Sequence, residues 1–173
     1  MSGNAITINN GGVNSKLVSR AISRLYCGYA NSTALTTTAQ GVWARYPDPS
    51  VAIETWRVHD FETPTTSDRF TYTGSQPRWF RVDATCNVLK AAGGLQTRTV
   101  ALQWYLNGAP IGAIREAQMG TDSSIISGTG EVYLQTGDYL EPWITNLENG
   151  DAIRLFNCSF NIVEDYTHSF ILE

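Results

Sequence analysis

The sequence predicts an all-β protein, an antiparallel β-sandwich of the jelly-roll class preceded by a short N-terminal arm. Strand patterns in which every second residue is apolar recur from about residue 22 to residue 162, and turn residues separate them. The 173 residues suffice for one domain with a core of its own. Because so many strands in an open sheet would leave aggregation-prone edges, we expect a sandwich or a closed barrel.

The leading segment differs in composition from the rest of the chain. It is polar, and residues 9–12 form a break of two Asn and two Gly. After this break, apolar residues at positions 13, 17, 21 and 25 recur at helical spacing, so a short helix and an extended arm are both compatible with the pattern. We therefore divide the chain into an N-terminal arm, residues 1–21, and a jelly-roll head, residues 22–173.

The clearest strand pattern runs from residue 78 to residue 89. Its alternate apolar residues define the face expected to meet the core: Phe80, Val82, Ala84, Cys86 and Val88. A second strand is expected at 97–106. Asn107 and Gly108 follow it directly, and this dipeptide is the strongest short signal for a β-hairpin.

The second half of the chain continues the same pattern. Further strands are expected at 125–135, 139–147 and 152–162, separated by turns rich in Gly, Asn and Asp. Weaker candidates occupy 22–29, 41–45, 51–58 and 69–73. No internal repeat is visible, which disfavours a propeller or a β-solenoid.

Several large apolar side chains fall on the strand face that should meet water. They are Trp79, Tyr105, Tyr139, Trp143 and Leu155, with Ile153 on the same side as the last of them. One interpretation is that these strands are buried on both faces, or that the arm or a loop covers them. The other is a subunit interface, where aromatic residues are enriched. We favour the second and expect the first five residues to form a homotrimer interface, because a closed ring leaves no such patch exposed.

Residues with catalytic or metal-binding chemistry do not gather in a recognisable pattern. The two histidines, His59 and His168, occur in no metal-ligand spacing, and the acidic residues after His59 fit a solvated loop better than a metal site. Asp138 and Glu141 include oxygens that Ca²⁺ accepts, but Asp138 follows a glycine in a tight turn and is better explained as the cap of that turn. We expect no enzymatic activity, no cofactor and no metal.

Charge is distributed unevenly along the chain. Residues 1–47 contain four basic and no acidic residues, whereas residues 48–173 contain eight basic and sixteen acidic residues. An acidic body argues against nucleic acid as a partner, because phosphate binding needs a basic face. The basic leading segment suits docking on an acidic protein surface, and its candidate anchoring residues are Lys16, Leu17, Arg20 and Arg24.

Cysteine usage indicates the compartment in which the protein assembles. Cys27, Cys86 and Cys158 are odd in number and widely spaced, so we expect three free thiols, as in a reducing cytosol. The N-terminus lacks the pattern of a secretion signal, and no apolar run approaches the length of a membrane span. We expect no membrane partner.

Residues 134–146, Leu-Gln-Thr-Gly-Asp-Tyr-Leu-Glu-Pro-Trp-Ile-Thr-Asn, carry a family resemblance. They resemble the segment near the end of tumour-necrosis-factor-like jelly rolls, in the version found in structural proteins of tailed bacteriophages. Four further stretches fit the family in the right order: 69–74, 79–82, 105–108 and 158–162. The resemblance implies a ten-stranded type of jelly roll that forms a compact threefold trimer, with no cofactor and no reaction.

The resemblance also implies a role. We expect a homotrimeric capsid decoration (cement) protein or head-fibre protein, which binds the major capsid protein or another virion protein on the outer capsid surface through its arm. It would assemble in the host cytoplasm and end on the virion surface. The alternative is a receptor- or glycan-binding knob of a tail fibre or spike, with a host-surface glycan as partner. The two roles share a fold, and fold alone does not decide function.

Overall fold

The computed structural model of the chain describes residues 6–10, 13–17, 22–28, 34–35, 40–45, 54–62, 69–90, 98–119, 123–148 and 153–165. Within these ranges every regular element is a β-strand, and all the strand pairings are antiparallel. The prediction of an all-β, antiparallel protein is therefore confirmed.

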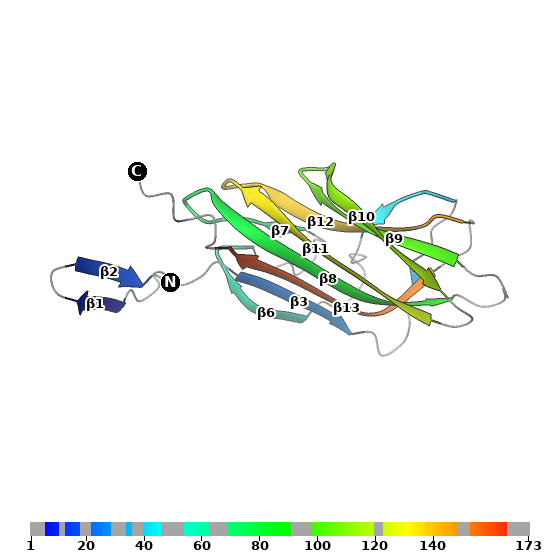
Figure 1. Cartoon of the computed structure of the whole chain (residues 1–173), viewed down its shortest axis with the longest axis horizontal. Coiled ribbons are helices and arrows are strands. Elements are labelled where there is room, and N and C mark those ends of the chain that lie inside the picture. Colours follow the sequence, from blue (N-terminus) through cyan, green and yellow to red (C-terminus); the bar gives the residue numbers. More distant parts are fainter. Residues whose placement is uncertain are drawn as a thin grey trace.

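Two sheets form the body of the molecule (Figure 1). The first, called the β8 sheet, has the strand order β11-β8-β13-β3-β6, with β4 beside β13. Its strands are β3 (Ile22–Gly28), β4 (Ala34–Leu35), β6 (Glu54–His59), β8 (Arg78–Lys90), β11 (Ser123–Leu134) and β13 (Ile153–Glu164).

The second sheet, called the β12 sheet, has the strand order β10-β9-β12-β5, with β7 also paired to β12. Its strands are β5 (Ala44–Arg45), β7 (Phe70–Thr71), β9 (Arg98–Leu106), β10 (Ala109–Met119) and β12 (Tyr139–Asn146). The weaker strand candidates of the sequence are all present, although β5 and β7 contain only two residues each.

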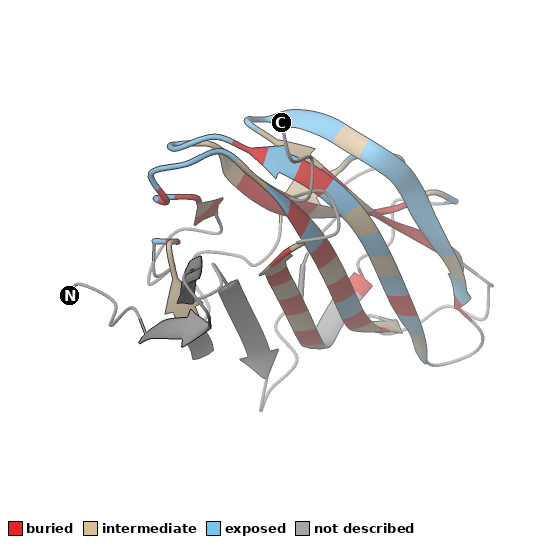
Figure 2. Cartoon of the chain, turned by 60° about the vertical axis from the view of Figure 1, so that its left-hand side comes forward, coloured by how far each residue is buried: buried red, intermediate tan, exposed pale blue. Residues whose placement is uncertain are grey.

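The hydrophobic core lies between the two sheets. Along β8, the alternate residues Phe80, Val82, Ala84, Cys86 and Val88 are all buried, as the sequence pattern predicted. Aromatic rings join the layers: Phe70 and Trp104 of the β12 sheet lie 6.2 and 5.9 Å from Phe160 of the β8 sheet, in edge-to-face contacts. Figure 2 shows the resulting alternation of buried and exposed bands along the strands.

Strand β10 is the element that the sequence pattern missed. Asn107 and Gly108 form the predicted hairpin turn, with φ of 52° and 81°, but no strand was expected after it. The strand lies at the sheet edge and is mostly exposed, and a bulge between Ile111 and Arg115 shifts its register against β9. An exposed, bulged edge strand needs no apolar alternation, so its sequence carries little signal.

The N-terminal segment contains a separate two-stranded sheet. Strands β1 (Ile6–Asn10) and β2 (Val13–Leu17) pair with each other, and Asn10 is the partner of Val13. The helical alternative for this segment is wrong over 13–17, because the residues around the Asn-Gly break form a hairpin instead. Figure 1 places this hairpin beside the body and outside its two sheets.

A bulge in β13 corrects one prediction about its faces. Ile153 was expected to point away from the core, opposite Cys158, Phe160 and Ile162, but its side chain is fully buried with theirs. The pairing of β13 with β8 shifts by one residue between Leu155 and Cys158. The extra residue in β13 reverses the order in which side chains point to the two faces of the sheet. Ile153, an odd-numbered residue before the bulge, therefore points to the core, as do the even-numbered residues Cys158, Phe160 and Ile162 after it.

No segment in the described ranges forms a helix of the length and apolar character that a bilayer crossing requires.

Candidate binding surfaces

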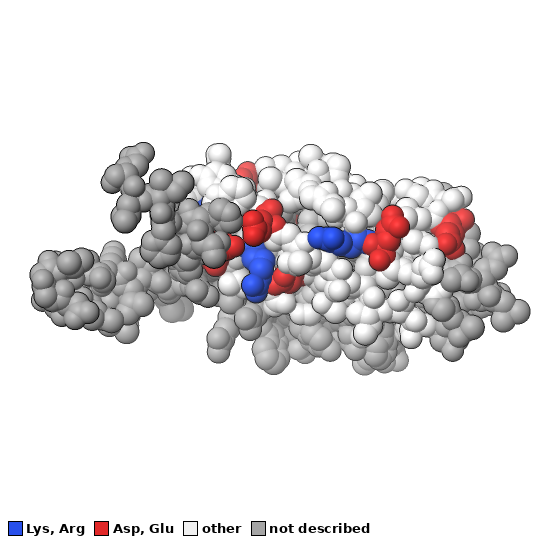
Figure 3. Space-filling view, viewed as in Figure 1, with Lys and Arg blue, Asp and Glu red and all other residues white. Residues whose placement is uncertain are grey.

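The outer face of β8 and β11 carries an exposed aromatic pair. Trp79 and Tyr133 are cross-strand partners, their ring centroids lie 5.4 Å apart, and their side chains are 39% and 43% exposed. Ile125, on the same side of β11, is 65% exposed. Figure 3 shows acidic and basic side chains next to one another on the visible face of the described residues. On the same side of β8 and β11 as the aromatic pair, Glu131 is the cross-strand partner of Arg81, and Arg81 forms an ion pair with Asp83. A face that presents exposed aromatic rings bordered by charged side chains is suited to association with another protein surface.

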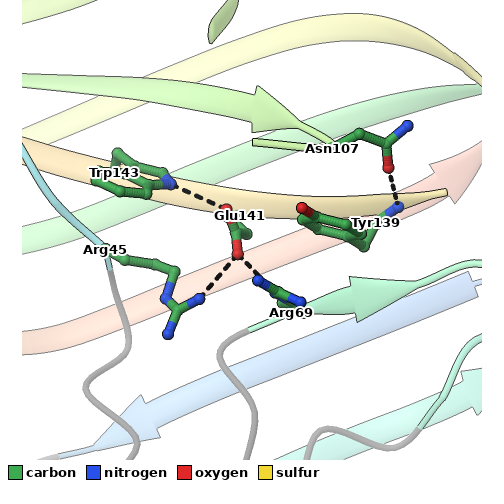
Figure 4. A network of polar contacts seen from close by, with 6 residues as sticks. All are labelled: Arg45, Arg69, Asn107, Tyr139, Glu141 and Trp143. Carbon is green, nitrogen blue, oxygen red and sulfur yellow. Dashed lines mark hydrogen bonds and ion pairs between the residues drawn. The ribbon is translucent and has the colours of Figure 1, made fainter. Parts of the chain in front are cut away.

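A second cluster lies on the outer face of β12 and centres on Glu141 (Figure 4). Glu141 Oε1 accepts hydrogen bonds from Arg69 Nε at 2.8 Å and from Arg45 Nη1 at 3.0 Å. Its Oε2 accepts one from Trp143 Nε1 at 3.2 Å. The carboxylate side chain is 2% exposed although it stands opposite the core, because these three side chains cover it.

Aromatic rings surround this carboxylate and contact one another. The rings of Tyr105 and Trp143 stack with centroids 4.6 Å apart, and Trp43 lies 6.5 Å from Tyr105. The Arg69 guanidinium lies over the Tyr139 ring, 4.3 Å from its centroid, in cation–π geometry. The cluster therefore ties β12 to β5 and β7 from the outside.

The electrostatics of the cluster favour the ionised carboxylate. Burial by itself would raise the pKa of Glu141, but the hydrogen bonds from Arg69, Arg45 and Trp143 outweigh it and hold the pKa below its usual value of 4.5. Glu141 is thus a structural anion with its partners in place, and nothing in its geometry makes it an acid or base at neutral pH.

The turn before β12 satisfies its own polar groups. Asp138 Oδ2 accepts a hydrogen bond from Gln135 N at 2.8 Å, and Asp138 Oδ1 accepts one from Asn107 Nδ2 at 2.8 Å. Asn107 Oδ1 in turn accepts from Tyr139 N at 3.0 Å. The interpretation of Asp138 as the cap of its own turn is confirmed. Within the described ranges no three His, Cys, Asp or Glu side chains lie close enough to hold a metal ion.

The structure divides the five residues predicted for a trimer interface between two sheets. Trp79 lies on the outer face of the β8 sheet, whereas Tyr105, Tyr139 and Trp143 lie together on the outer face of the β12 sheet and are half-buried by their own neighbours. The partial burial of Tyr105, Tyr139 and Trp143 agrees with the other interpretation, in which a loop covers the outer face of these strands. The side chain of Leu155 lies outside the described residues. The interface itself stays a prediction.

The candidate anchoring residues are also divided. Lys16 and Leu17 lie on β2 of the hairpin, whereas Arg24 lies on β3 within the β8 sheet, where its backbone pairs with those of Trp56 and Asn161. Arg20 lies outside the described residues. A hairpin that carries Lys16 and Leu17 is still compatible with docking, and this too stays a prediction.

Two hollows adjoin at the open edge between β10 and β11. The inner cavity, of about 50 Å³, lies between the sheets and includes Trp104 in its lining. The outer hollow, of about 460 Å³, lies on the face of β8 and β11. Both are bordered by Arg115, whose Nη2 donates a hydrogen bond to the Thr129 carbonyl at 3.2 Å and so spans the gap between the strands.

Tyr133, Ile125 and the cavity at the β10 bulge were not expected from the sequence. Tyr133 and Ile125 were identifiable in principle, because they stand out of phase with the buried Ile126, Val132 and Leu134 on the same strand. The cavity had no signal in the sequence, since the bulge that opens it depends on the pairing of β10 with β9.

Comparison with known proteins identifies the fold. No known protein-family profile matches the chain, and no curated protein sequence matches it. Among solved structures, murine APRIL at pH 5.0 is similar with a TM-score of 0.51 at 12% identity, over 83% of this chain and 99% of that one. Eiger TNF from S. frugiperda is similar with a TM-score of 0.54 at 10% identity, over 84% and 92% of the two chains. The predicted tumour-necrosis-factor-like jelly roll is confirmed.

Proposed function

We propose that the protein is a homotrimeric binding protein of the virion surface, a capsid decoration or head-fibre protein, and not an enzyme. Two things support the proposal: the jelly-roll fold, and the resemblance of residues 134–146 and four further stretches to structural proteins of tailed bacteriophages. The observation that carries the self-association is the exposed aromatic pair of Trp79 and Tyr133, with Ile125 on the same face.

Self-association follows from the cost of leaving these side chains in water. Burying one large apolar side chain contributes about 1.5–3 kcal/mol to the stability of an assembly. A closed trimer would bury these side chains in each of its three subunits. The Glu141 cluster, in contrast, is already packed against its own neighbours. We therefore assign the principal contact to the outer face of the β8 sheet around Trp79 and Tyr133.

Light scattering after gel filtration tests the trimer directly. We expect a mass of about 57 kDa at micromolar concentration, three times the 19.0 kDa of one chain. Tyr133→Asp should shift the population to monomers, because a desolvated charge without a partner is strongly unfavourable at an interface. Val42→Asp is the matched control, since Val42 is 44% exposed and Tyr133 43%. Val42 lies beside β12 of the other sheet, where its carbonyl accepts a hydrogen bond from Thr145 Oγ1. A wild-type mass of one chain would refute self-association, and equal effects of the two variants would refute this contact.

The virion position is tested with particles. We expect antibodies to the protein to label the heads of intact particles, and a variant lacking residues 1–20 to remain folded without binding particles that lack the protein. The truncation leaves β3 and both main sheets complete. Binding of the truncated chain at wild-type level would show that the arm is not the anchor, and labelling of tails alone would overturn the decoration role.

The alternative, a receptor- or glycan-binding knob, is favoured by a different observation. At Arg115 an inner cavity, lined by apolar side chains together with Gln103 and Glu131, adjoins an outer hollow whose lining includes hydroxyl and carboxylate side chains. Such a combination is typical of sites for small polar molecules. Labelling of tails in the particle experiment would support this alternative.

A further inference from the structure

The hairpin turn between β9 and β10 contains a side-chain amide with a reactive neighbour. Asn107 is followed directly by Gly108, and both residues are exposed. In such a dipeptide the backbone nitrogen of the glycine is able to attack the side-chain carbonyl carbon of the asparagine, because glycine has no side chain to hinder the approach. The fate of Asn107 therefore depends on how the structure holds its amide.

Both polar atoms of the Asn107 amide are engaged in hydrogen bonds. Nδ2 donates to Asp138 Oδ1 at 2.8 Å, and Oδ1 accepts from Tyr139 N at 3.0 Å. The backbone N of Asn107 donates to the Tyr139 carbonyl, also at 3.0 Å. Asp138 is itself held in place, since its Oδ2 accepts from Gln135 N at 2.8 Å. Asn107 therefore ties the turn between β9 and β10 to the start of β12.

Cyclisation of Asn107 requires these side-chain contacts to break. The Gly108 nitrogen forms a bond to Asn107 Cγ, the Cγ–Nδ2 bond breaks, and Nδ2 leaves as ammonia with the proton of the Gly108 amide. Because the planar amide carbon becomes tetrahedral on the way, the hydrogen bonds with Asp138 and Tyr139 are lost before ammonia departs. A hydrogen bond to an ionised carboxylate is among the stronger ones in proteins. The closed turn therefore protects Asn107, and the open turn exposes it to attack.

The product of the reaction does not restore the turn. Water hydrolyses the cyclic imide at one of its two carbonyl carbons and leaves aspartate or isoaspartate at position 107. Aspartate replaces the Nδ2 donor by an anionic oxygen that faces Asp138 Oδ1, and like charges so close together repel. Isoaspartate adds a carbon to the backbone of a turn whose two central residues have φ of 52° and 81°. Such a turn fixes the register of its strands, so a longer backbone disturbs the pairing of β9 with β10.

We propose that Asn107 is a site of spontaneous deamidation, which is protected while the β9–β10 turn is closed on Asp138 and which makes the opening of that turn irreversible. The consequence falls on β10, because this edge strand is mostly exposed and carries a bulge. Release of β10 leaves the edge of β9 unpaired, and unpaired edges associate with one another. The inference depends neither on the trimer nor on the position in the virion.

Peptide mass spectrometry of aged protein tests the site. The full chain is incubated at mildly alkaline pH, once native and once unfolded in urea, and the Asn107 peptide is quantified over time. We expect conversion to aspartate and isoaspartate in the unfolded chain, and conversion slower by about tenfold or more in the native chain, because only the open turn reacts. Equal rates in the two states would refute the protection. An Asn107 that survives in the unfolded chain would refute the site.

Two variants identify the protecting contact. Asp138→Ala removes the acceptor of Asn107 Nδ2 and should speed conversion in the native chain. Gln135→Ala alters an exposed side chain of the same turn and should react like wild type. The urea midpoint of each variant shows whether it is folded during the incubation. Equal rates of the two folded variants would remove Asp138 from the mechanism.

The variant Asn107→Asp reproduces one product of the reaction and does not rely on the fold of the Asp138 variant. We expect a lower urea midpoint than that of wild type at pH 7, because two ionised carboxylates face each other in the folded state. The difference from wild type should shrink as the pH falls and the carboxylates become protonated. A midpoint equal to that of wild type at pH 7, or a difference that does not change with pH, would overturn the irreversibility.

Discussion

At the scale of single residues, Glu141 shows how a side chain on the solvent side of a strand becomes buried. The side chains of β12 point alternately to the two faces of the sheet, so Leu140 and Ile144 lie in the core and Glu141 and Trp143 lie on the opposite face. Arg45 and Arg69 reach Glu141 from short strands or loops distant in sequence, and their own side chains stay 33% and 44% exposed. A charge buried with several charge-assisted hydrogen bonds is stable when ionised and costly when any partner is removed.

This arrangement predicts a dependence of stability on pH. Because the folded-state pKa of Glu141 lies below its usual 4.5, the carboxylate contributes stability at pH values above 4.5 and loses it as the pH falls through the lowered pKa. Glu141→Gln should reduce the free energy of unfolding by about 1–3 kcal/mol at pH 7. Its loss of stability on acidification should be smaller than that of wild type. Urea unfolding from pH 7 to pH 3 checks both; parallel pH profiles of the two proteins would contradict the assignment.

At the scale of elements, the β9–β10 hairpin shows that two turn residues can position a strand whose sequence has only a weak apolar pattern. Asn107 and Gly108 both adopt positive φ, as a two-residue hairpin turn of this type requires, and Asn107 also holds the backbone of Tyr139. The turn therefore sets the register of β9 with β10 and secures the start of β12. β10 itself lacks an apolar row and depends on this turn for its place.

The turn predicts a measurable cost for one methyl group. Gly108→Ala forces a Cβ into the left-handed region at φ 81° and should lower the free energy of unfolding by about 1–2 kcal/mol. Gly130→Ala is the matched comparison, because Gly130 lies within β11 outside the left-handed region and a Cβ there meets Val82 at 3.6 Å. Urea titrations of the two variants measure the difference; equal midpoints would mean that the turn is not strained.

At the scale of the whole molecule, the sandwich encloses the described thiols. Cys158 is the cross-strand partner of Cys86 on one side and of Cys27 on the other, so the three cysteines stand in one row across β3, β13 and β8. The side chains of Cys86 and Cys158 are buried between the two sheets. The side chain of Cys27 lies outside the described residues. Access to the buried pair requires the sheets to separate.

This enclosure predicts how the thiols react. Cys86 and Cys158 should resist a thiol reagent in the native protein and react together when denaturant separates the sheets, because both lie in one cooperative core. Counting under denaturing, non-reducing conditions should return three thiols per chain. Mass spectrometry of the labelled peptides identifies each site. Labelling of Cys86 in the native state faster than unfolding would place it outside the core, and a count of one thiol would reveal a disulfide.

The sequence alone determined the features that depend on local chemistry. The alternation from Phe80 to Val88 specified which face of β8 is buried, since apolar residues at every second position all point to one face of a sheet. Asn107 and Gly108 specified a turn, because few residues adopt positive φ at low cost. Five motifs in order were sufficient for the jelly-roll class, which the fold comparison confirms.

Only the tertiary structure decided the features that depend on pairing between distant segments. The bulge of β13 moved Ile153 into the core, and the bulge of β10 opened the cavity at Trp104, because register shifts belong to a pair of strands and not to either sequence. Glu141 became buried through arginines that precede it by 72 and 96 positions. Which outward side chains share a face depends on the layering of the two sheets, and this layering separated Trp79 from Trp143.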